Sequence, residues 1–407
     1  MSDDITIEVP TAADWDRLYQ VTSTAFHEDV SEAGANAEAM VFELERGLVA
    51  RRDGDIVGTG GILTRALAVP GGSVPAAHVT MIAVAATARR QGVLTRFMRR
   101  QFDDARAAGE PIAVLWATEG RIYQRFGYGL AATRLNLTIE NREVELLLPP
   151  APGRMREGSP SELRDALVKL YEEAYATHPG WSERAAKHWD YRLADLEQWR
   201  RGSTSLRAAI HEGEHGGDGY ALWRATNRWT DTGPASEVRV LEIVTTTPAA
   251  YAAVWRYLLT IDLTRMTNVW SVPPDEPLLS AISEPRRLDA RLGDALWVRV
   301  LDVPAALAAR RYVTEIDVVL ELTDALVPAN AGRWRLHGSP TAASCISTVD
   351  EPDLSCDIRA LSAAYLGGTS LASLAGSGQV TEHRTGALDR AAAAFGWHRA
   401  PSSFEVF

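Results

Sequence analysis

The chain has 407 residues, which predicts two to four domains at roughly 100–200 residues per domain. Lys and Arg number 42 against 53 Asp and Glu, and the formal net charge of −11 argues against a protein that binds a phosphate backbone, while it leaves a cationic substrate open. Hydrophobic residues make up 46% and charged residues 23% of the chain, so a mainly disordered protein is excluded.

The sequence also indicates whether the chain spans a membrane and whether its cysteines form disulfides. The apolar stretches are shorter than the ~18 residues that a spanning helix needs, so we expect no membrane span. The opening Met1–Asp4 is acidic and lacks the basic and apolar regions of a secretory signal, which predicts a cytoplasmic protein. Cys345 and Cys356 are too few for a disulfide framework or a zinc ribbon, so both are expected to be reduced and buried.

The first part of the chain predicts an α+β domain. Thr11 and Asp14 form a capping-box pattern before an amphipathic helix, and Asp53-Gly54 predicts a tight turn between two strands. The expected elements are a strand at 5–9, a helix running to Phe26, strands at 48–52, 55–63 and 77–84, a helix at 92–108, a strand at 112–117 and a short helix ending at Gly127.

The clearest break in the sequence lies at Pro149, Pro150, Pro152 and Gly153. After it the order of elements repeats, which predicts a degenerate internal duplication. The repeated elements are a helix at 163–175, strands at 206–210, 220–223 and 238–244, and a helix at 249–259. A strand at 296–301 opens a third α+β region that ends with an Ala-rich helix at 387–395. We therefore expect domains at 1–148, 149–295 and 296–407.

A strand at 79–84 runs into a basic, glycine-bearing turn and then a helix. The turn reads Arg89-Arg90-Gln91-Gly92. Free N–H groups in a first helical turn, the helix dipole and adjacent arginines form a site for a pyrophosphate, and glycine allows close backbone approach. An ordinary strand-to-helix turn with solvated arginines fits the same pattern, so this motif alone does not establish a pyrophosphate site.

A second motif follows the strand at 112–116, where residues 122–128 read Ile-Tyr-Gln-Arg-Phe-Gly-Tyr. Together the motifs resemble the GNAT superfamily of acetyl-CoA-dependent N-acetyltransferases, whose signature is Arg/Gln-x-x-Gly-x-Gly/Ala and then Tyr-x-x-x-Gly-Phe/Tyr. Arg89 and Gly92 match its first two anchors, whereas Leu94 stands where a small residue is usual.

Over its whole length the chain resembles the enhanced intracellular survival (Eis) acetyltransferases of actinobacteria. Their loop reads Arg-Arg-x-Gly-x-Leu and their later segment Ile-Tyr-x-Arg-Phe-Gly-Tyr, and residues 296–304, 365–368 and 397–407 add to the likeness. The resemblance implies an α+β chain with tandem GNAT domains, the second one degenerate, then a sterol-carrier-protein-like domain, all assembled as a homohexamer. It implies acetyl-CoA as cosubstrate and no metal.

The resemblance also assigns the catalytic groups. N-acetylation needs a neutral amine, donors for the oxyanion and a proton for the departing thiolate. The proton donor maps to Tyr123 and the base to the C-terminal carboxylate of Phe407. Tyr128 is the rival donor, but its place at the start of the next strand favours packing. The apolar ending, with Phe404 before Phe407, predicts a docked tail, which structural packing alone would also explain; Glu405 would add negative charge for a cationic substrate.

The expected cofactor contacts fall in three groups. The backbone of Ile82, Ala83 and Val84 should pair with the pantetheine arm, and Thr118 and Glu119 should border the cofactor. The pyrophosphate should be held by Arg89, Arg90, Gln91, Gly92, Val93, Leu94 and Thr95. The equivalent turn in the central region, 245–249, lacks arginine and glycine, so this region is expected to wall the substrate cavity and build subunit contacts rather than bind cofactor.

Two other motifs are discounted. His211 to His215 spells the zinc-protease pattern H-E-x-x-H, but Gly213 and the glycines after it favour a hairpin loop over a helix. The glycosylation sequon at Asn136 is set aside because the expected compartment does not fit.

These features predict an acetyl-CoA-dependent N-acetyltransferase that acts on primary amines of polycationic small molecules, aminoglycoside antibiotics above all, at one position or several. The partner is then a cationic amine and not a nucleic acid. One alternative is acetylation of lysine side chains in peptides or proteins. A second is a noncatalytic carrier of an apolar ligand, which the set Arg89, Gly92 and Tyr123 disfavours.

Overall fold

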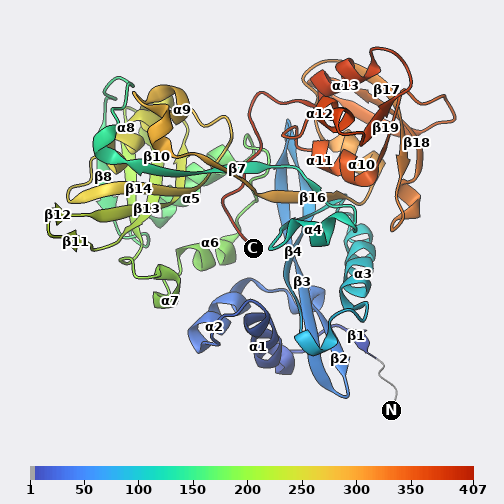
Figure 1. Cartoon of the computed structure of the whole chain (residues 1–407), viewed down its shortest axis with the longest axis horizontal. Coiled ribbons are helices and arrows are strands. Elements are labelled where there is room, and N and C mark those ends of the chain that lie inside the picture. Colours follow the sequence, from blue (N-terminus) through green and yellow to red (C-terminus); the bar gives the residue numbers. More distant parts are fainter. Residues whose placement is uncertain (1–4) are drawn as a thin grey trace.

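The computed structural model describes residues 5–407, and the acidic opening at residues 1–4 lies outside this range. The described chain forms two seven-stranded sheets, a five-stranded sheet and a two-stranded ribbon, with helices packed on the three larger sheets. This arrangement confirms the expected α+β class. Figure 1 shows the first sheet upright in the middle, with the other two sheets on either side of its upper end.

The first sheet has the order β1-β2-β3-β4-β5-β16-β6. Its strands are β1 (Thr6–Glu8), β2 (Leu48–Arg52), β3 (Asp55–Val69), β4 (Gly72–Val84), β5 (Ile112–Trp116), β16 (Leu296–Val300) and β6 (Gly129–Leu130). The tight turn after β2 is confirmed, because Asp53 and Gly54 have φ values of 51° and 87°. Helix α1 (Trp15–Ala25) packs on this sheet and follows the predicted capping box, in which the Asp14 carboxylate accepts from the backbone N–H of Thr11 at 2.8 Å.

Helix α3 (Val93–Ala107) also packs on the first sheet, and the short helix α4 (Gly120–Gln124) follows β5. The apolar side of α3 contributes Met98 and Phe102 to a core cluster that also holds Tyr123 and Tyr128. This cluster connects α3 with α4, so it positions the second sequence motif against the first.

The second sheet has the order β15-β7-β14-β13-β10-β9-β8. Its strands are β15 (Arg291–Asp294), β7 (Thr133–Glu140), β14 (Thr264–Val272), β13 (Ser236–Thr245), β10 (Gly216–Ala225), β9 (Arg207–Gly213) and β8 (Arg154–Gly158). Burial alternates strictly along β13, as expected for a strand whose two faces differ in their surroundings. Helices α5 (Arg164–Tyr175) and α8 (Pro248–Leu259) correspond to the predicted helices at 163–175 and 249–259. They contribute to two separate core clusters of this sheet.

The third sheet has the order β19-β18-β17-β20-β21. Its strands are β19 (Ala343–Ser347), β18 (Gly332–Gly338), β17 (Ile316–Thr323), β20 (Leu354–Asp357) and β21 (Val380–Glu382), with helices α10 (Val303–Ala309), α11 (Ile358–Ala364), α12 (Leu371–Gly376) and α13 (Ala387–Phe395). One apolar core joins it to the first sheet, since Val298 and Leu320 belong to the same cluster. Cys345 is buried as expected, whereas Cys356 is partly exposed.

Two strands cross the boundaries expected from the sequence. β7 precedes the Pro-rich break but pairs with β14 and β15 in the second sheet. β16, expected to open the third region, completes the first sheet by antiparallel pairing with β5 and β6. The apolar residues of β16 predict a buried strand, but a local pattern carries no information about which strand it will pair with.

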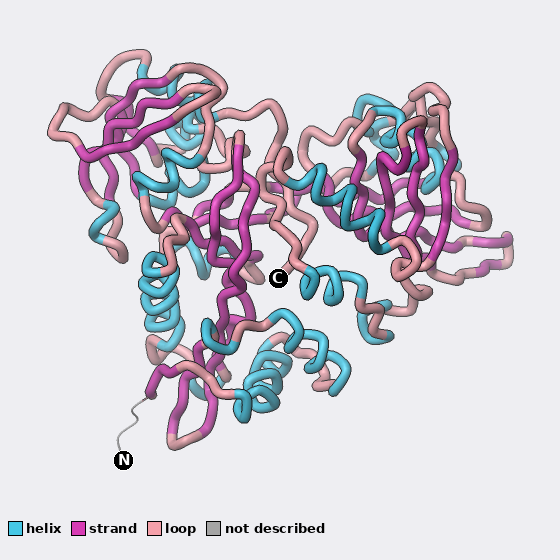
Figure 2. Tube along the Cα trace, turned by 180° about the vertical axis from the view of Figure 1, so that it is seen from behind, coloured by secondary structure: helices cyan, strands magenta, loops and turns pink. Residues whose placement is uncertain are grey.

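The remaining helices include three that the sequence patterns did not predict: α2 (Glu32–Val41), α6 (Ala186–Leu193) and α7 (Glu197–Arg200). Helix α9 (Leu278–Ala281) was not predicted either. The strands β11 (Trp229–Thr230) and β12 (Gly233–Pro234) form the two-stranded ribbon. Seen from behind in Figure 2, as in Figure 1, the C-terminus lies in the space between the first and second sheets. Among residues 5–407, no helix combines the length and apolar character needed to cross a membrane.

Candidate active site

The strands β4 and β5 separate partway along their length. Their parallel pairing covers only Ala76–His78 against Ile112–Val114, although β4 continues to Val84. β4 also carries an extra residue relative to β3, and Met81 adopts a φ of 51° in this bulge. Beyond the bulge, residues 82–84 have no ladder partner on β5, although Ala83 and Val84 still pair with β3, so the backbone groups that face β5 are available to an extended ligand.

The turn between β4 and α3 presents basic side chains to solvent. Arg89, Arg90, Gln91 and Gly92 are all exposed, and Arg90 and Gly92 have φ values of 64° and 78°. A Cβ on Gly92 would meet no atom within 4 Å. Glycine is therefore favoured here by the left-handed backbone conformation and not by a lack of space. No side chain caps the first turn of α3, which leaves its N–H groups and helix dipole directed at this basic turn.

The next three residues of the predicted pyrophosphate site form the first turn of α3. Val93 is buried, and Leu94 and Thr95 are partly buried. Val93 packs in the cluster that also contains Val84, which ties the end of β4 to the start of α3. The structure therefore brings the two ends of the predicted contact segment together.

The equivalent turn of the second sheet is already capped. The Thr247 hydroxyl accepts from the Ala250 N–H of α8 at 3.0 Å and donates to the Asp218 carboxylate at 2.8 Å. A carboxylate at a helix N-terminus satisfies the dipole and repels a phosphate. This contact supports the prediction that the turn at 245–249 does not bind a cofactor.

Tyr123 lies on α4, beside the gap between β4 and β5. It is 7% exposed and belongs to the cluster against which Ile82 and Leu94 pack. Burial raises the pKa of Tyr123 to about 12, so the phenol is protonated at neutral pH and able to donate a proton. Tyr123 thus lies with one residue from each of the two predicted cofactor segments.

Tyr128, the rival donor, is buried deeper. It is 0% exposed, its ring contacts that of Tyr123 edge to face at 5.8 Å between centroids, and its hydroxyl has no partner among the described residues. Burial raises the pKa of Tyr128 well above its usual range. This environment supports the packing role predicted for Tyr128.

Thr118 and Glu119 lie in the exposed loop between β5 and α4. The Glu119 carboxylate pairs with Arg121 at 2.7 Å, and both side chains remain largely in solvent. The structure places these two residues after β5 as expected, at the mouth of the gap and not inside a cavity.

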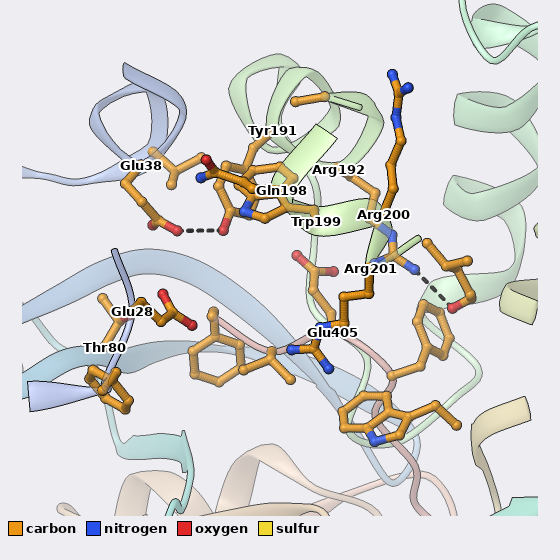
Figure 3. A pocket seen from close by; sticks show the side chains of 18 of the residues that line it. Glu28, Glu38, Thr80, Tyr191, Arg192, Gln198, Trp199, Arg200, Arg201 and Glu405 are labelled. Carbon is orange, nitrogen blue, oxygen red and sulfur yellow. Dashed lines mark hydrogen bonds between the residues drawn. The ribbon is translucent and has the colours of Figure 1, made fainter. Parts of the chain in front are cut away.

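A cavity of ≈ 1270 Å³ lies between the first and second sheets. It begins at Thr80 and Met81 on the bulge of β4, and residues of α2, α6, α7 and the end of the chain also line it. Figure 3 shows some of these lining side chains, among them Glu38, Tyr191, Trp199 and Glu405. None of the predicted cofactor residues lines it, whereas Phe407 does. The cavity and the basic turn are therefore two separate parts of the site, with the bulge of β4 bordering the cavity and leading into the segment 82–84.

The end of the chain is docked and not free. The Ser402 N–H donates to the Pro179 carbonyl at 3.0 Å, and the Trp181 indole donates to the Ser402 hydroxyl at 3.1 Å. The Phe404 ring packs edge to face on Trp181 at 4.7 Å between centroids. These contacts hold the chain along the second domain until it reaches the cavity.

Glu405 anchors the tail to both sheets. Its carboxylate accepts from Nη1 of Arg65 on β3 at 2.7 Å and from Nε of Arg184 at 2.9 Å. Burial by itself would raise the pKa of Glu405, but the charges of Arg65 and Arg184 outweigh it and hold this pKa well below its usual range. Arg184 in turn pairs with Glu242 of β13 at 2.9 Å. These ion pairs hold Glu405 in place, and Glu405 precedes the terminal Phe407 by two residues, so they restrict the position of Phe407.

His78 lies against the terminal residue. The rings of His78 and Phe407 contact edge to face at 4.7 Å between centroids. His78 is fully buried, with Nε2 2.8 Å from the Ser182 hydroxyl and Nδ1 3.0 Å from the Ala76 carbonyl. Burial lowers the pKa of His78 to about 3, so its ring is neutral and serves as a wall of the tail site.

The H-E-x-x-H segment forms the expected hairpin, because β9 ends at Gly213 and β10 begins at Gly216. His211 is buried in β9, with Nδ1 2.6 Å from Asp218 and Nε2 3.0 Å from the Pro152 carbonyl. Both ring nitrogens of His211 have protein partners. Asn136 of the sequon lies within β7 and lines the cavity.

Several site residues escaped prediction from the sequence. Arg65, Arg184 and His78 meet at the chain end only in the folded state, and each is surrounded in sequence by residues that read as ordinary strand or loop. Helix α2 could have been predicted from its N-cap residue. Ser31, a residue type that is favoured at this position, caps the helix by accepting from the Gly34 N–H at 3.0 Å.

Comparison with known families matches three segments. Residues 6–131 and residues 180–300 each match an acetyltransferase (GNAT) domain, and residues 303–403 match a sterol carrier protein domain. This order confirms the expected architecture of two GNAT domains followed by a sterol-carrier-protein-like domain.

Similar proteins match over nearly the full length. An uncharacterized N-acetyltransferase of Streptomyces avermitilis is 42% identical over 395 residues, which is 95% of this chain and 96% of that one. The N-acetyltransferase Eis of Mycobacterium bovis is 32% identical over 408 residues, covering 96% of each chain. The crystal structure of Eis1 from Mycobacterium abscessus superposes with a TM-score of 0.85 at 30% identity, covering 99% of this chain and 100% of that one.

Proposed function

This chain belongs to the Eis family of GNAT N-acetyltransferases, and from that premise we propose that it transfers the acetyl group of acetyl-CoA to a primary amine held in the cavity between its two GNAT domains. The observation that carries the proposal is the position of Tyr123. It packs with Ile82 and Leu94 beside the gap between β4 and β5, while the chain end is anchored in the cavity that begins at the bulge of β4.

The residues at the gap fit acetyl-CoA. An uncapped helix start preceded by Arg89 and Arg90 suits the pyrophosphate, and the backbone of 82–84 on the side facing β5 suits the amide groups of the pantetheine arm. Gln91, Gly92, Val93, Leu94 and Thr95 complete the phosphate-binding segment. Thr118 and Glu119, in the loop after β5, border the cofactor in this proposal. When bound, acetyl-CoA supplies the thioester whose carbonyl carbon is attacked.

Tyr123 and Phe407 have opposite roles in the transfer. The amine nitrogen forms a bond to the thioester carbonyl carbon, and the bond from that carbon to sulfur breaks. The terminal carboxylate of Phe407 takes the proton that the amine loses, and the Tyr123 hydroxyl gives a proton to the departing thiolate. An α-carboxylate with a pKa near ~3.3–3.7 is a weak base, so its fixed position in the cavity has to compensate for its low basicity.

The substrate class rests on the acidic wall of the cavity. Glu28, Asp29 and Glu38 lie on the side formed by α1, α2 and the loop between them. Glu38 accepts from the Tyr191 hydroxyl at 2.7 Å, as Figure 3 shows, and burial raises the pKa of Glu38. Carboxyl groups in this wall support a cationic amine substrate, and polycationic aminoglycosides acetylated at one or more positions are the candidates that the family resemblance implies.

Lysine side chains of peptides or proteins are the second candidate. The observation that favours them is that the exposed Gln198 and the half-buried Trp199 of α7 line the cavity, so that solvent reaches it on this side and a long lysine side chain can enter. Competition between a lysine peptide and a small amine in one assay separates these two substrate classes. The cytoplasmic location and the homohexamer remain proposals from the resemblance, and sedimentation analysis tests the second.

The test is a thiol-release assay with acetyl-CoA and a panel of primary amines, combined with calorimetry of CoA binding. The expected result is saturable turnover with at least one amine class and loss of CoA affinity when both Arg89 and Arg90 become Gln. A protein that does not bind CoA, or that releases no thiol with any amine, contradicts the proposal.

A further inference from the structure

The wall of the cavity opposite the acidic one is rich in arginine. Arg200 and Arg201 lie at the end of α7, Arg224 lies on β10 and Arg239 on β13, and all four line the cavity. Within the described residues, Asp195 is the only acidic group paired with any of them, and it binds both Arg200 and Arg224. One carboxylate therefore pairs with two of the four guanidinium groups, and the other two are left without an acidic partner, so this wall keeps a net positive charge.

Two of these arginines face one another across neighbouring strands. Arg224 and Arg239 are register partners in the antiparallel pair β10 and β13, and the side chain of Arg224 is 6% exposed. Like charges directly opposite each other destabilise a sheet. The Asp195 carboxylate compensates the charge of Arg224, so Arg239 is the member of this pair whose charge has no acidic partner among the described residues.

Arg201 and Arg239 have no ion pair among residues 5–407. The polar contact of the Arg239 guanidinium is with the Arg201 carbonyl at 3.5 Å, and Arg201 adopts a φ of 49° at the end of α7. Arg239 is half-buried and Arg201 is exposed. A guanidinium with unfilled donors binds a carboxylate or phosphate by charge-assisted hydrogen bonds. Both residues are thus free to bind an anion that enters the cavity.

The cavity is larger than the ~300–1,000 Å³ of most small-molecule sites, so an amine and a distant group of the same molecule fit together. We infer that the preferred substrate is an amine that also carries an anionic group, a carboxylate or a phosphate, which the arginine wall of Arg200, Arg201, Arg224 and Arg239 binds. This inference rests on the proposed function, since it assigns the substrate class of the same cavity.

The test compares matched substrates. Turnover is measured for a series of ω-amino carboxylates, the ω-amino amides of the same length, aminoalkyl phosphates and an aminoglycoside without an acidic group. The expected result is a KM about 10- to 100-fold lower for the anionic amines than for the amides, as for a charge-assisted hydrogen bond of ~1.5–3 kcal/mol. The carboxylate and phosphate arms show which anion is preferred.

Arg239→Gln and Arg201→Gln should remove this preference while the amide substrates keep their KM. Arg286→Gln is the matched control, because Arg286 is an exposed arginine of the same domain that does not line the cavity. Equal KM values for anionic amines and amides in the unchanged protein, an aminoglycoside preferred over every anionic amine, or a preference that survives both cavity variants would each overturn the inference.

A binding measurement tests the arginine wall without turnover. Inorganic phosphate should raise the melting temperature of the unchanged protein more than that of Arg239→Gln, with Arg286→Gln behaving like the unchanged protein. Phosphate bound at the turn of Arg89 contributes equally to all three proteins. If no amine is acetylated but this difference is found, the proposed function fails and the anion site stands; if the difference is absent, the anion site fails.

Discussion

Nη1 of Arg65, in the second half of β3, lies 2.7 Å from Oε1 of Glu405, close to the end of the chain. The same carboxylate binds Arg184, so one side chain connects the first domain, the second domain and the C-terminal tail. The arginines are nearly fully buried. Removing the carboxylate would leave the buried Arg65 without its ion-pair partner, Arg184 with Glu242 alone, and the tail without its anchor.

Glu405→Gln should therefore lower both activity and stability. We expect a loss of ~3–5 kcal/mol in the free energy of unfolding, the usual cost of breaking a buried ion pair from one side. We expect kcat to fall with little change in CoA affinity, because the cofactor segments lie outside the cavity. Denaturant unfolding and calorimetry measure these effects. Glu119→Gln, which removes an exposed carboxylate, is the control for stability.

The pH dependence of stability follows from the same contact. The pKa of Glu405 is lower in the folded protein than in the unfolded chain, where a Glu titrates near ~4.3. The folded state therefore gains stability from this group above that pH and loses it as the pH falls toward the folded pKa. Unfolding measured at acidic pH should show a shallower decline in Glu405→Gln; an unchanged slope would contradict the anchor.

Tyr123→Phe should lower kcat by ~10²-fold or more, the usual contribution of a positioned proton donor, with little change in the melting temperature. Tyr128→Phe is the matched control. Its hydroxyl is buried without a partner, so its removal should leave kcat within a few-fold and should maintain or raise stability. Steady-state kinetics of the two variants decide between them, and a greater loss in Tyr128→Phe would reverse their roles.

Adding one Gly after Phe407 should abolish most of the turnover. The extra residue moves the terminal carboxylate by ~3.8 Å, far more than the ~1 Å misplacement that can cost 10²-fold in rate. Val406→Ala keeps the carboxylate in place and changes an exposed side chain, so it should remain active. Equal kcat for the extended and unchanged proteins would show that the base is another group.

Gly92→Ala and Gly109→Ala form a pair at the two ends of α3. Both glycines have a left-handed φ, 78° and 73°, and open space around the missing Cβ, so each alanine should cost ~1–2 kcal/mol of stability. Only Gly92→Ala should also weaken CoA binding, because it distorts the turn that carries Arg89 and Arg90. Calorimetry measures this difference; equal CoA affinity would exclude the turn as the pyrophosphate site.

Local patterns predicted the elements better than their partners. Asp53-Gly54 predicted a turn that depends only on neighbouring residues, and the helix at 387–395 was found for the same reason. The strand at 296–301 was also found, but its pairing with β5 depends on residues about 180 positions earlier in sequence.

The candidate site divides in the same way. Arg89, Gly92 and Tyr123 belong to contiguous motifs, so the sequence indicated them. The anchor formed by Arg65, Arg184 and Glu405 joins residues from three distant segments, and a buried charge pair leaves no local periodicity. The arginine wall was not predicted, because the overall charge of −11 gives no information about where positive side chains gather in the folded protein.

The exchange of β7 and β16 has a consequence for how the protein is made. The chain leaves the first sheet through β6 and β7, builds the second domain, and returns through β15 and β16, so the second domain is an insertion in the first. During synthesis the first sheet cannot close until Val300 has left the ribosome, although domains usually fold in order from the N-terminus. Until β16 is synthesised, the first domain therefore remains incomplete, and the edge of β5 with which β16 pairs stays uncovered.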